Sequence, residues 1–285
     1  MTALWIALAL LAVLGAAALT AWLLVRARRA PAGTPALPAR RAAAPEPATA
    51  VVLVHGLLGF DRIQVLGVQW SYFRGIAPRL QARGVRVHVV RVPPLASVPE
   101  RAARLAEQVA ALPDRRVVLL AHSMGGLDAR WAIARLGLAD RVAALISIGT
   151  PHRGAPLAEL GGRTALVRLL GGDRTSRALE WLTPARLRRF NVEVPDHPDV
   201  FYGSVVGALR VGGLSAGTSD GLVPVASQRW GEVMAELDAD HWAQIGWSRS
   251  FDAAGAYLRI LDRLGERGLF RASQSAASSS RAATG

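Results

Sequence analysis

Hydrophobic positions between residues 50 and 270 follow two patterns that alternate along the chain. The first is a short, mainly apolar run, and it occurs at residues 50–54, 85–90, 117–121 and 142–148, with Arg86, His88 and Ser147 as the polar exceptions. Such runs are typical of strands that are buried on both faces of a sheet. Two later segments, residues 201–207 and 232–237, are further strand candidates.

The second pattern is a helical spacing of apolar residues between these strands. Ile76 and Leu80 predict one helix, which ends at Gly84; a capping box predicts another that begins after Ser97; a third ends before Gly137. Strands that alternate with helices predict an α/β fold with a mostly parallel, doubly wound sheet. In such sheets the ligand sites collect at the carboxyl ends of the strands.

The start of the chain has a different pattern. Residues 3–25 are 23 positions without a charge, and Arg26, Arg28 and Arg29 follow them. As a helix this run spans roughly 34 Å and covers the core of a bilayer. The alternative is a cleaved signal peptide, but those begin with basic residues and have a shorter apolar stretch. We therefore expect residues 1–29 to be a transmembrane anchor with a basic flank, in a single-pass protein of the bacterial inner membrane.

The remaining segments define the expected domain organisation. Residues 30–49 are rich in Pro and Ala, which predicts a semi-extended linker. Residues 271–285 are polar and of low complexity, which is typical of a disordered tail. Since the chain contains no internal repeat, residues 50–270 are expected to form one domain.

Composition narrows the possible chemistry. All 34 basic residues are arginines, and with 21 acidic residues they give a formal charge of +13. These arginines are dispersed and no recognition motif accompanies them, so we expect no nucleic-acid partner. The absence of cysteine excludes disulfides, zinc–thiolate sites and a cysteine nucleophile. No cofactor is expected.

The segment from residue 117 to residue 131 carries the sharpest motif. An apolar strand leads through Ser123 directly into a predicted helix, and the small residues Ala121 and Gly125 stand two positions before and after the serine. Small neighbours are required when a serine sits at the apex of a tight strand–turn–helix elbow. A nucleophile in this place has the N–H of Met124 and a helix N-terminus beside it, which favour developing negative charge. An N-capping serine on an ordinary turn is the alternative.

A serine nucleophile needs a base and an orienting carboxylate. Of the six histidines, His241 lies in a polar loop directly after a predicted strand. Asp220 lies in a glycine-flanked loop after another predicted strand, and Asp238 and Asp240 are its rivals. The order Ser123, Asp220, His241 is the one expected when an α/β sheet supports a triad.

Several longer motifs resemble one family over residues 50 to about 250. The sequence is similar to the secreted bacterial triacylglycerol lipases of the Pseudomonas and Burkholderia type, which have the α/β-hydrolase fold. The resemblance implies that Ser123 is the nucleophile, Asp220 the acid and His241 the base, with the backbone N–H groups of Leu57 and Met124 as oxyanion donors. The motifs that carry it are VLVHGLLGFD (52–61), AHSMGGLDARW (121–131), SIGTPHRGAP (147–156), SDGLVPVAS (219–227) and DADHW (238–242).

The chain departs from this family in two places. Ala121 replaces the glycine usual in the elbow, and we expect the added methyl to be accommodated. Ala243 stands where the family has a calcium-binding aspartate, so we predict no structural metal. The lack of cysteine also removes the disulfide of some relatives.

Residues 153–195 interrupt the strand–helix alternation with many leucines and arginines. One interpretation is an amphipathic helical lid that covers an acyl pocket over Ser123 and opens at a lipid surface. The alternative is ordinary helical packing. The basic side of such a lid would suit anionic headgroups.

These observations favour a serine-dependent carboxylic-ester hydrolase, a lipase or esterase that acts on lipid or acyl esters through an acyl-enzyme. A thioesterase, phospholipase or acyltransferase would use the same triad. A catalytically silent hydrolase-like membrane adaptor is a third possibility, and the retained Ser123, Asp220 and His241 argue against it. The secreted relatives favour an external catalytic domain, whereas the arginines that follow the apolar span favour a cytoplasmic one.

Overall fold

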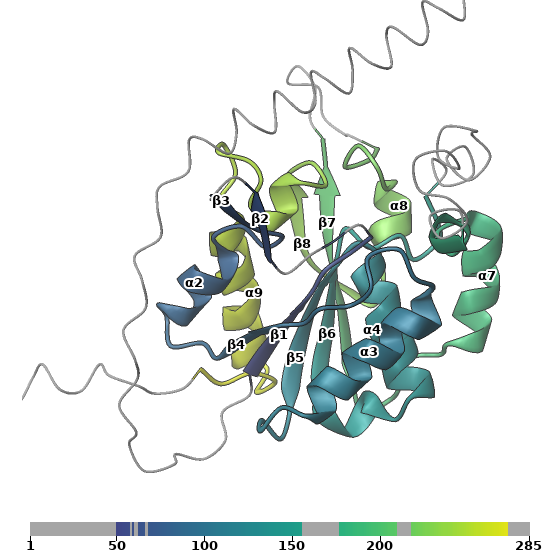
Figure 1. Ribbon diagram of the computed structural model, residues 1–285, viewed down its shortest axis with the longest axis horizontal. Helices are drawn as coiled ribbons and strands as arrows, with labels where there is room; N and C mark the ends of the chain where they lie inside the picture. Colours follow the sequence, from purple (N-terminus) through teal and green to yellow (C-terminus); the bar gives the residue numbers. More distant parts are fainter. Residues whose placement is uncertain are drawn as a thin grey trace, which may run out of the picture. The chain divides into compact units, whose positions relative to one another are not determined.

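A parallel sheet of six strands lies at the centre of the computed structural model, in the order β4-β1-β5-β6-β7-β8 (Figure 1). The structure describes residues 50–57, 59, 62–65, 68–155, 177–209 and 218–272, all within the unit formed by residues 42–285. Every neighbouring pair in this sheet is parallel. The strands are β1 (Ala50–Val54), β4 (Val87–Val89), β5 (Val117–His122), β6 (Val142–Ile148), β7 (Phe201–Ala208) and β8 (Glu232–Asp238).

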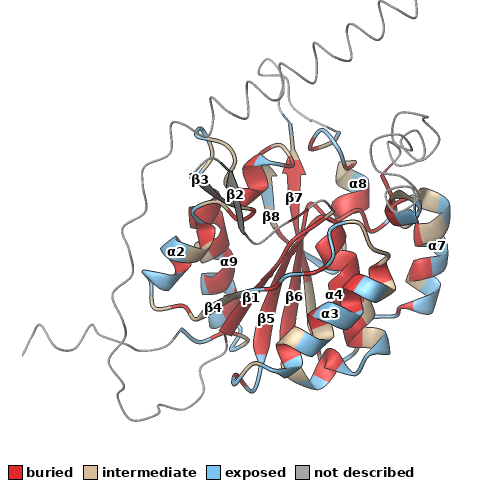
Figure 2. Cartoon of the chain, in the orientation of Figure 1, coloured by how far each residue is buried: buried red, intermediate tan, exposed pale blue. Residues whose placement is uncertain are grey.

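Both faces of the sheet are covered, which explains the continuous apolar runs. Successive side chains of a strand point to opposite faces. Val51 and Leu53 of β1 therefore pack with α2 (Ile76–Gln81) and α9 (Ala253–Glu266). Val52 and Val54 pack on the other side with α3 (Val98–Ala110) and α4 (Met124–Arg135). Figure 2 shows the buried strands between these two helical layers.

Most predicted elements occur in the structure. β1 and β6 have the predicted bounds, and β5, β7 and β8 each extend one residue further. The carboxylate of Glu100 accepts the backbone N–H of Ser97 at 2.9 Å, so the capping box at the start of α3 is formed. Gly84 and Gly137, predicted to end the first and third helices, have φ angles of 77° and 71°.

The strand prediction was wrong at one edge of the sheet. β4 covers only Val87–Val89 of the six residues predicted, and it pairs with a neighbour on one side only, β1. An antiparallel hairpin, β2 (Arg62–Val65) and β3 (Val68–Ser71), was not predicted. The short α8 (Val225–Gln228) and the long α9 were not predicted either.

The predicted anchor 1–29 and linker 30–49 lie outside the described residues, as do residues 273–285 of the predicted tail. In the part that the structure does describe, no helix has the length and apolar character needed to cross a membrane.

Candidate active site

Ser123 occupies the sharp turn between β5 and α4. Its φ of 55° and ψ of −131° make it the only non-glycine residue with a positive φ among the described residues. Such a backbone persists only when its surroundings hold it in place. Ser123 N–H donates to the carbonyl of Ile148 at 2.9 Å, and the hydroxyl of Thr150 donates to the carbonyl of Ser123 at 2.8 Å. The end of β6 therefore holds the turn from both sides.

The small neighbours of Ser123 have a clear steric reason. A side chain at Gly125 would place its Cβ 2.7 Å from the carbonyl oxygen of Val54. A Cβ at Gly56 would lie 2.7 Å from the Cβ of Ser123 itself. Ala121 is completely buried and its methyl packs in the cluster around α3 and α4, so the elbow accommodates alanine here.

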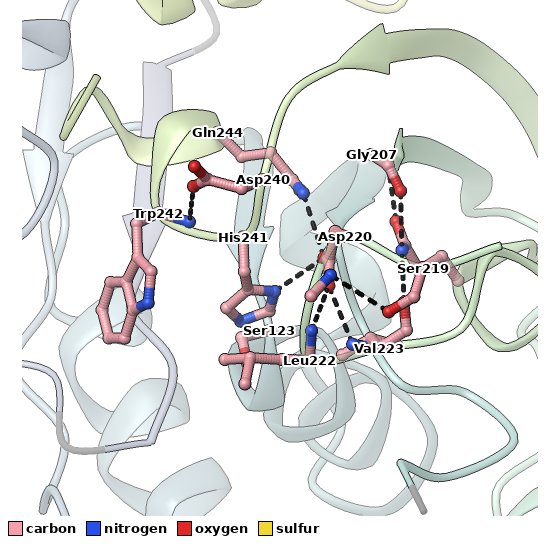
Figure 3. Close-up of polar contacts among 12 residues, drawn as sticks. Ser123, Gly207, Ser219, Asp220, Leu222, Val223, Asp240, His241, Trp242 and Gln244 are labelled. Atoms are coloured by element: carbon pink, nitrogen blue, oxygen red, sulfur yellow. Dashed lines mark hydrogen bonds and ion pairs between the residues drawn. The ribbon is translucent and has the colours of Figure 1, made fainter. Parts of the chain in front are cut away.

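His241 and Asp220 lie together after the last two strands of the sheet (Figure 3). His241 Nδ1 is 2.7 Å from Asp220 Oδ2, and His241 N–H donates to the carbonyl of Asp220 at 2.9 Å. Because a carboxylate only accepts, Nδ1 carries a proton, so in the neutral form of the ring Nε2 is the nitrogen with the lone pair. Figure 3 draws Ser123 on the Nε2 side of this ring, away from Asp220. The residue before the serine, His122, contacts His241 through a 3.1 Å hydrogen bond.

Asp220 is oriented by four donors. Its Oδ1 accepts Leu222 N–H at 3.0 Å and Val223 N–H at 2.8 Å. Its Oδ2 accepts Gln244 Nε2 at 3.0 Å in addition to His241 Nδ1. The two rival carboxylates lie elsewhere: Asp240 Oδ1 caps the N–H groups of Trp242 and Ala243, and Asp238 is exposed at the end of β8. Nothing in the sequence pattern singled out Gln244, which lies three residues after the histidine.

The predicted oxyanion donors lie on two neighbouring turns. Leu57 follows β1 and Met124 follows Ser123, and within the described residues neither N–H group donates a hydrogen bond to the protein. Both side chains pack in one apolar cluster with α7 (Pro184–Glu193). The role of the two amides as oxyanion donors stays a prediction.

Arg101 holds the turn that carries Leu57, a role that the sequence did not reveal. This completely buried guanidinium donates Nη2 to the carbonyl of His55 and Nη1 to the carbonyl of Pro93, at 2.8 and 2.9 Å. Its Nε donates to Asp128 Oδ2 at 2.8 Å. Burial raises the pKa of Asp128 from 3.8 to about 6, although the charge and hydrogen bond of Arg101 lower it.

The residues that the structure describes contain no cluster of three or more histidine or acidic side chains that could hold a metal ion. Ala243 stands where the resembled family has a calcium-binding aspartate. Its backbone N–H donates to Asp240 Oδ1 at 2.7 Å. The absence of a structural metal stays a prediction.

Residues 156–176 of the predicted lid lie outside the described residues. The described part of that segment packs Leu187 and Phe190 of α7 against Met124 and Leu127 of α4. The described part of this segment therefore packs beside the nucleophile turn, and the choice between a lid and ordinary helical packing stays open.

Comparison with known proteins agrees with this geometry. The chain is 31% identical to triacylglycerol lipase 2 of Saccharomyces cerevisiae, in a match that covers 70% of this chain and 74% of the yeast protein. The chain belongs to the α/β-hydrolase lipases. It is a serine ester hydrolase of this family.

Other relatives match shorter parts of this lipase-family chain. A triacylglycerol lipase of Vibrio cholerae is 36% identical over 39% of this chain and 35% of its own length. One of Burkholderia plantarii is 34% identical over 38% of this chain and 31% of its own length. Residues 103–169 match the family model of the PGAP1-like alpha/beta domain.

Solved structures share the fold of this hydrolase. The mature form of Bacillus licheniformis lipase BlEst2 superposes with a TM-score of 0.62 at 21% identity, over 80% of this chain and 94% of the other. The metagenomic carboxyl esterase MGS0156 gives a TM-score of 0.63 at 23% identity, over 84% and 82%. The predicted α/β-hydrolase fold is confirmed.

Proposed function

We propose that this hydrolase cleaves carboxylic esters of lipids or other acyl compounds through an acyl-enzyme on Ser123. The observation that carries the proposal is the 2.7 Å contact between His241 Nδ1 and Asp220 Oδ2, in a ring whose other nitrogen is on the side of Ser123. This arrangement supplies a base of defined tautomer whose second nitrogen is on the side of the serine at the strained turn.

The reaction uses these groups in two steps. His241 Nε2 takes the hydroxyl proton as Ser123 Oγ attacks the ester carbonyl, and Asp220 stabilises the imidazolium that forms. The N–H groups of Leu57 and Met124 receive the oxyanion. The C–O bond to the alcohol breaks, and His241 gives its proton to the leaving oxygen. Water, deprotonated by His241, then attacks the acyl-enzyme. As the bond between the acyl carbon and Ser123 Oγ breaks, His241 returns the proton to Oγ, and the carboxylic acid is released.

Replacing the nucleophile tests this assignment. We expect Ser123→Ala to lower kcat on p-nitrophenyl esters by about 10⁴-fold or more, because the acyl-enzyme cannot form. A fluorescent phosphonate should label the wild-type protein and not this variant. Ser250→Ala, which changes an exposed serine, is the matched control and should keep both properties. Full activity or labelling of Ser123→Ala would show that the assignment is wrong.

The lipid substrate and the membrane anchor are parts of the same proposal. The named relatives are triacylglycerol lipases, and the bacterial ones support assignment to the Pseudomonas and Burkholderia type. The uncharged run of residues 3–25 supports insertion in the bilayer. We expect the full chain to stay with the membrane fraction after a carbonate wash. Release into the soluble fraction would contradict the anchor.

A further inference from the structure

Tyr72 and His122 form a buried polar chain between the oxyanion turn and the backbone of the base. Gly56 N–H donates to the Tyr72 hydroxyl at 3.1 Å, and that hydroxyl lies 2.8 Å from His122 Nδ1. His122 Nε2 lies 3.1 Å from the carbonyl oxygen of His241. The chain thus begins next to Leu57 and ends on the catalytic histidine, although its members come from distant parts of the sequence.

The proton positions along this chain follow from its last acceptor. The carbonyl of His241 can only accept, so His122 Nε2 carries a proton. Burial, followed by the charge of His241, lowers the pKa of His122 well below its usual value, so the ring is neutral and Nδ1 is an acceptor. The Tyr72 O–H therefore donates to Nδ1, and its oxygen accepts the N–H of Gly56. Each hydrogen bond in this polar chain then has one defined donor and one defined acceptor.

We propose that Tyr72 and His122 are positioning residues that hold the oxyanion turn and the base His241 in fixed relation on either side of Ser123. This inference rests on the proposed function. Ser123 must attack while its proton goes to His241 and negative charge arises at Leu57, so these two groups must be placed together. Misplacement by about 1 Å can cost on the order of 10²-fold in rate.

The place of His122 also requires a neutral residue. The centroids of the His122 and His241 rings are 4.4 Å apart. His241 becomes a cation during each step of the proposed reaction, and a second cation at this distance would oppose that change. The position therefore needs one donor, one acceptor and no charge. A neutral imidazole meets these conditions, and so does the amide of glutamine.

This requirement defines a set of variants for the full-length protein. His122→Gln keeps a donor and an acceptor, His122→Leu removes both, and Tyr72→Phe removes only the hydroxyl. Tyr257→Phe is the matched control, because this buried tyrosine has a hydroxyl with no hydrogen-bond partner among the described residues. The measurements are kcat and KM on p-nitrophenyl butyrate, and Tm.

We expect kcat to fall at least about tenfold in His122→Leu and Tyr72→Phe, with KM within about twofold of wild type. His122→Gln should restore kcat to within about threefold, and Tyr257→Phe should match wild type. Wild-type kcat in Tyr72→Phe or His122→Leu would overturn the inference, as would equal loss in His122→Gln and His122→Leu or a loss confined to KM.

Two features keep this test independent of folding and of the proposed function. If His122→Leu does not fold, Tyr72→Phe and its control carry the comparison, since each removes a single oxygen. Failure of the proposed function would appear as an active Ser123→Ala variant, whereas failure of the positioning role would appear as unchanged kcat in variants of an enzyme that still depends on Ser123.

Discussion

Asp220 and Asp128 are both buried carboxylates, 1% and 0% exposed, but their oxygens are paired in different ways. Asp220 accepts from four N–H donors, two on each oxygen, and none of them is an arginine. Asp128 has one oxygen against the guanidinium of Arg101, and its Oδ1 has no hydrogen-bond partner among the described residues. Asp220 is thus oriented by several surrounding N–H groups, whereas Asp128 depends on a single cation.

The difference corresponds to what each carboxylate does. A cation beside Asp220 would compete with the imidazolium of His241 for its charge, whereas backbone and amide donors fix the carboxylate and leave that charge available. Asp128 faces no reacting group, and its charge neutralises Arg101, which in turn holds the carbonyl of His55. The carboxylate that we propose as catalytic needs an unshared charge, whereas the one that pairs with Arg101 needs a partner.

The largest expected effect comes from Asp220→Asn. The side-chain oxygen can still accept from Leu222 and Val223, but the amide presents N–H groups to the protonated Nδ1 of His241 and disturbs its tautomer. We expect kcat to fall about 10⁴-fold with the fold retained. Asp238→Asn, at the exposed rival position, should keep wild-type kcat. If Asp238→Asn lost activity and Asp220→Asn kept it, the carboxylate of the triad would be Asp238 and not Asp220.

A smaller effect, on stability, is expected from Arg101→Met. The substitution leaves Asp128 as an unpaired buried charge, which costs about 3–5 kcal/mol in free energy of unfolding. Combining it with Asp128→Leu should recover part of this loss, because both charges are then gone. Urea unfolding at pH 8 of the wild type, the two single variants and the double variant gives the coupling. Strictly additive effects would show that the two side chains do not stabilise each other.

The smallest expected effect is a pH dependence with the opposite sign to that of an ordinary ion pair. Because the folded pKa of Asp128, about 6, exceeds its usual 3.8, the folded protein binds the proton more tightly than the unfolded chain. This contribution to stability is fully present below pH 3.8 and is lost as the pH rises through about 6.

The free energy of unfolding of the wild type, measured relative to Asp128→Asn, should therefore fall by up to about 3 kcal/mol between pH 4 and pH 7. Urea titrations of both proteins at pH 4, 5, 6 and 7 measure this difference. A difference that stays constant across these pH values would contradict the raised pKa.

Elements that are buried on both sides were the most predictable from the sequence. β1 and β6 could be placed to the residue because each is an apolar run, interrupted only by Ser147 in β6, with helices on both faces of the sheet. The hairpin β2–β3 has no such run. α9 does carry a signal: Tyr257, Leu261 and Leu264 recur at helical spacing, and Asp252 caps it by accepting the N–H of Gly255 at 3.0 Å.

The candidate site divides in the same way. Ser123 and His241 stand in motifs close after strands, and Asp220 was selected over Asp238 and Asp240 by the order of the three residues and by the family resemblance. Tyr72, Arg101 and Gln244 could not be found like this, because their partners depend on tertiary contacts. Tyr72, for example, meets His122 across 50 positions of chain. Buried polar partners of this kind leave no periodic pattern.

The strand order also determines when the site can form. The serine turn follows β5, but the carboxylate and the imidazole follow β7 and β8, the last two strands in sequence. Chains emerge from the ribosome with the N-terminal part first. A partly synthesised chain thus carries the hydroxyl of Ser123 and the two proposed oxyanion amides without a base, so the proposed ester-cleaving activity begins only after the final strand has been added to the sheet.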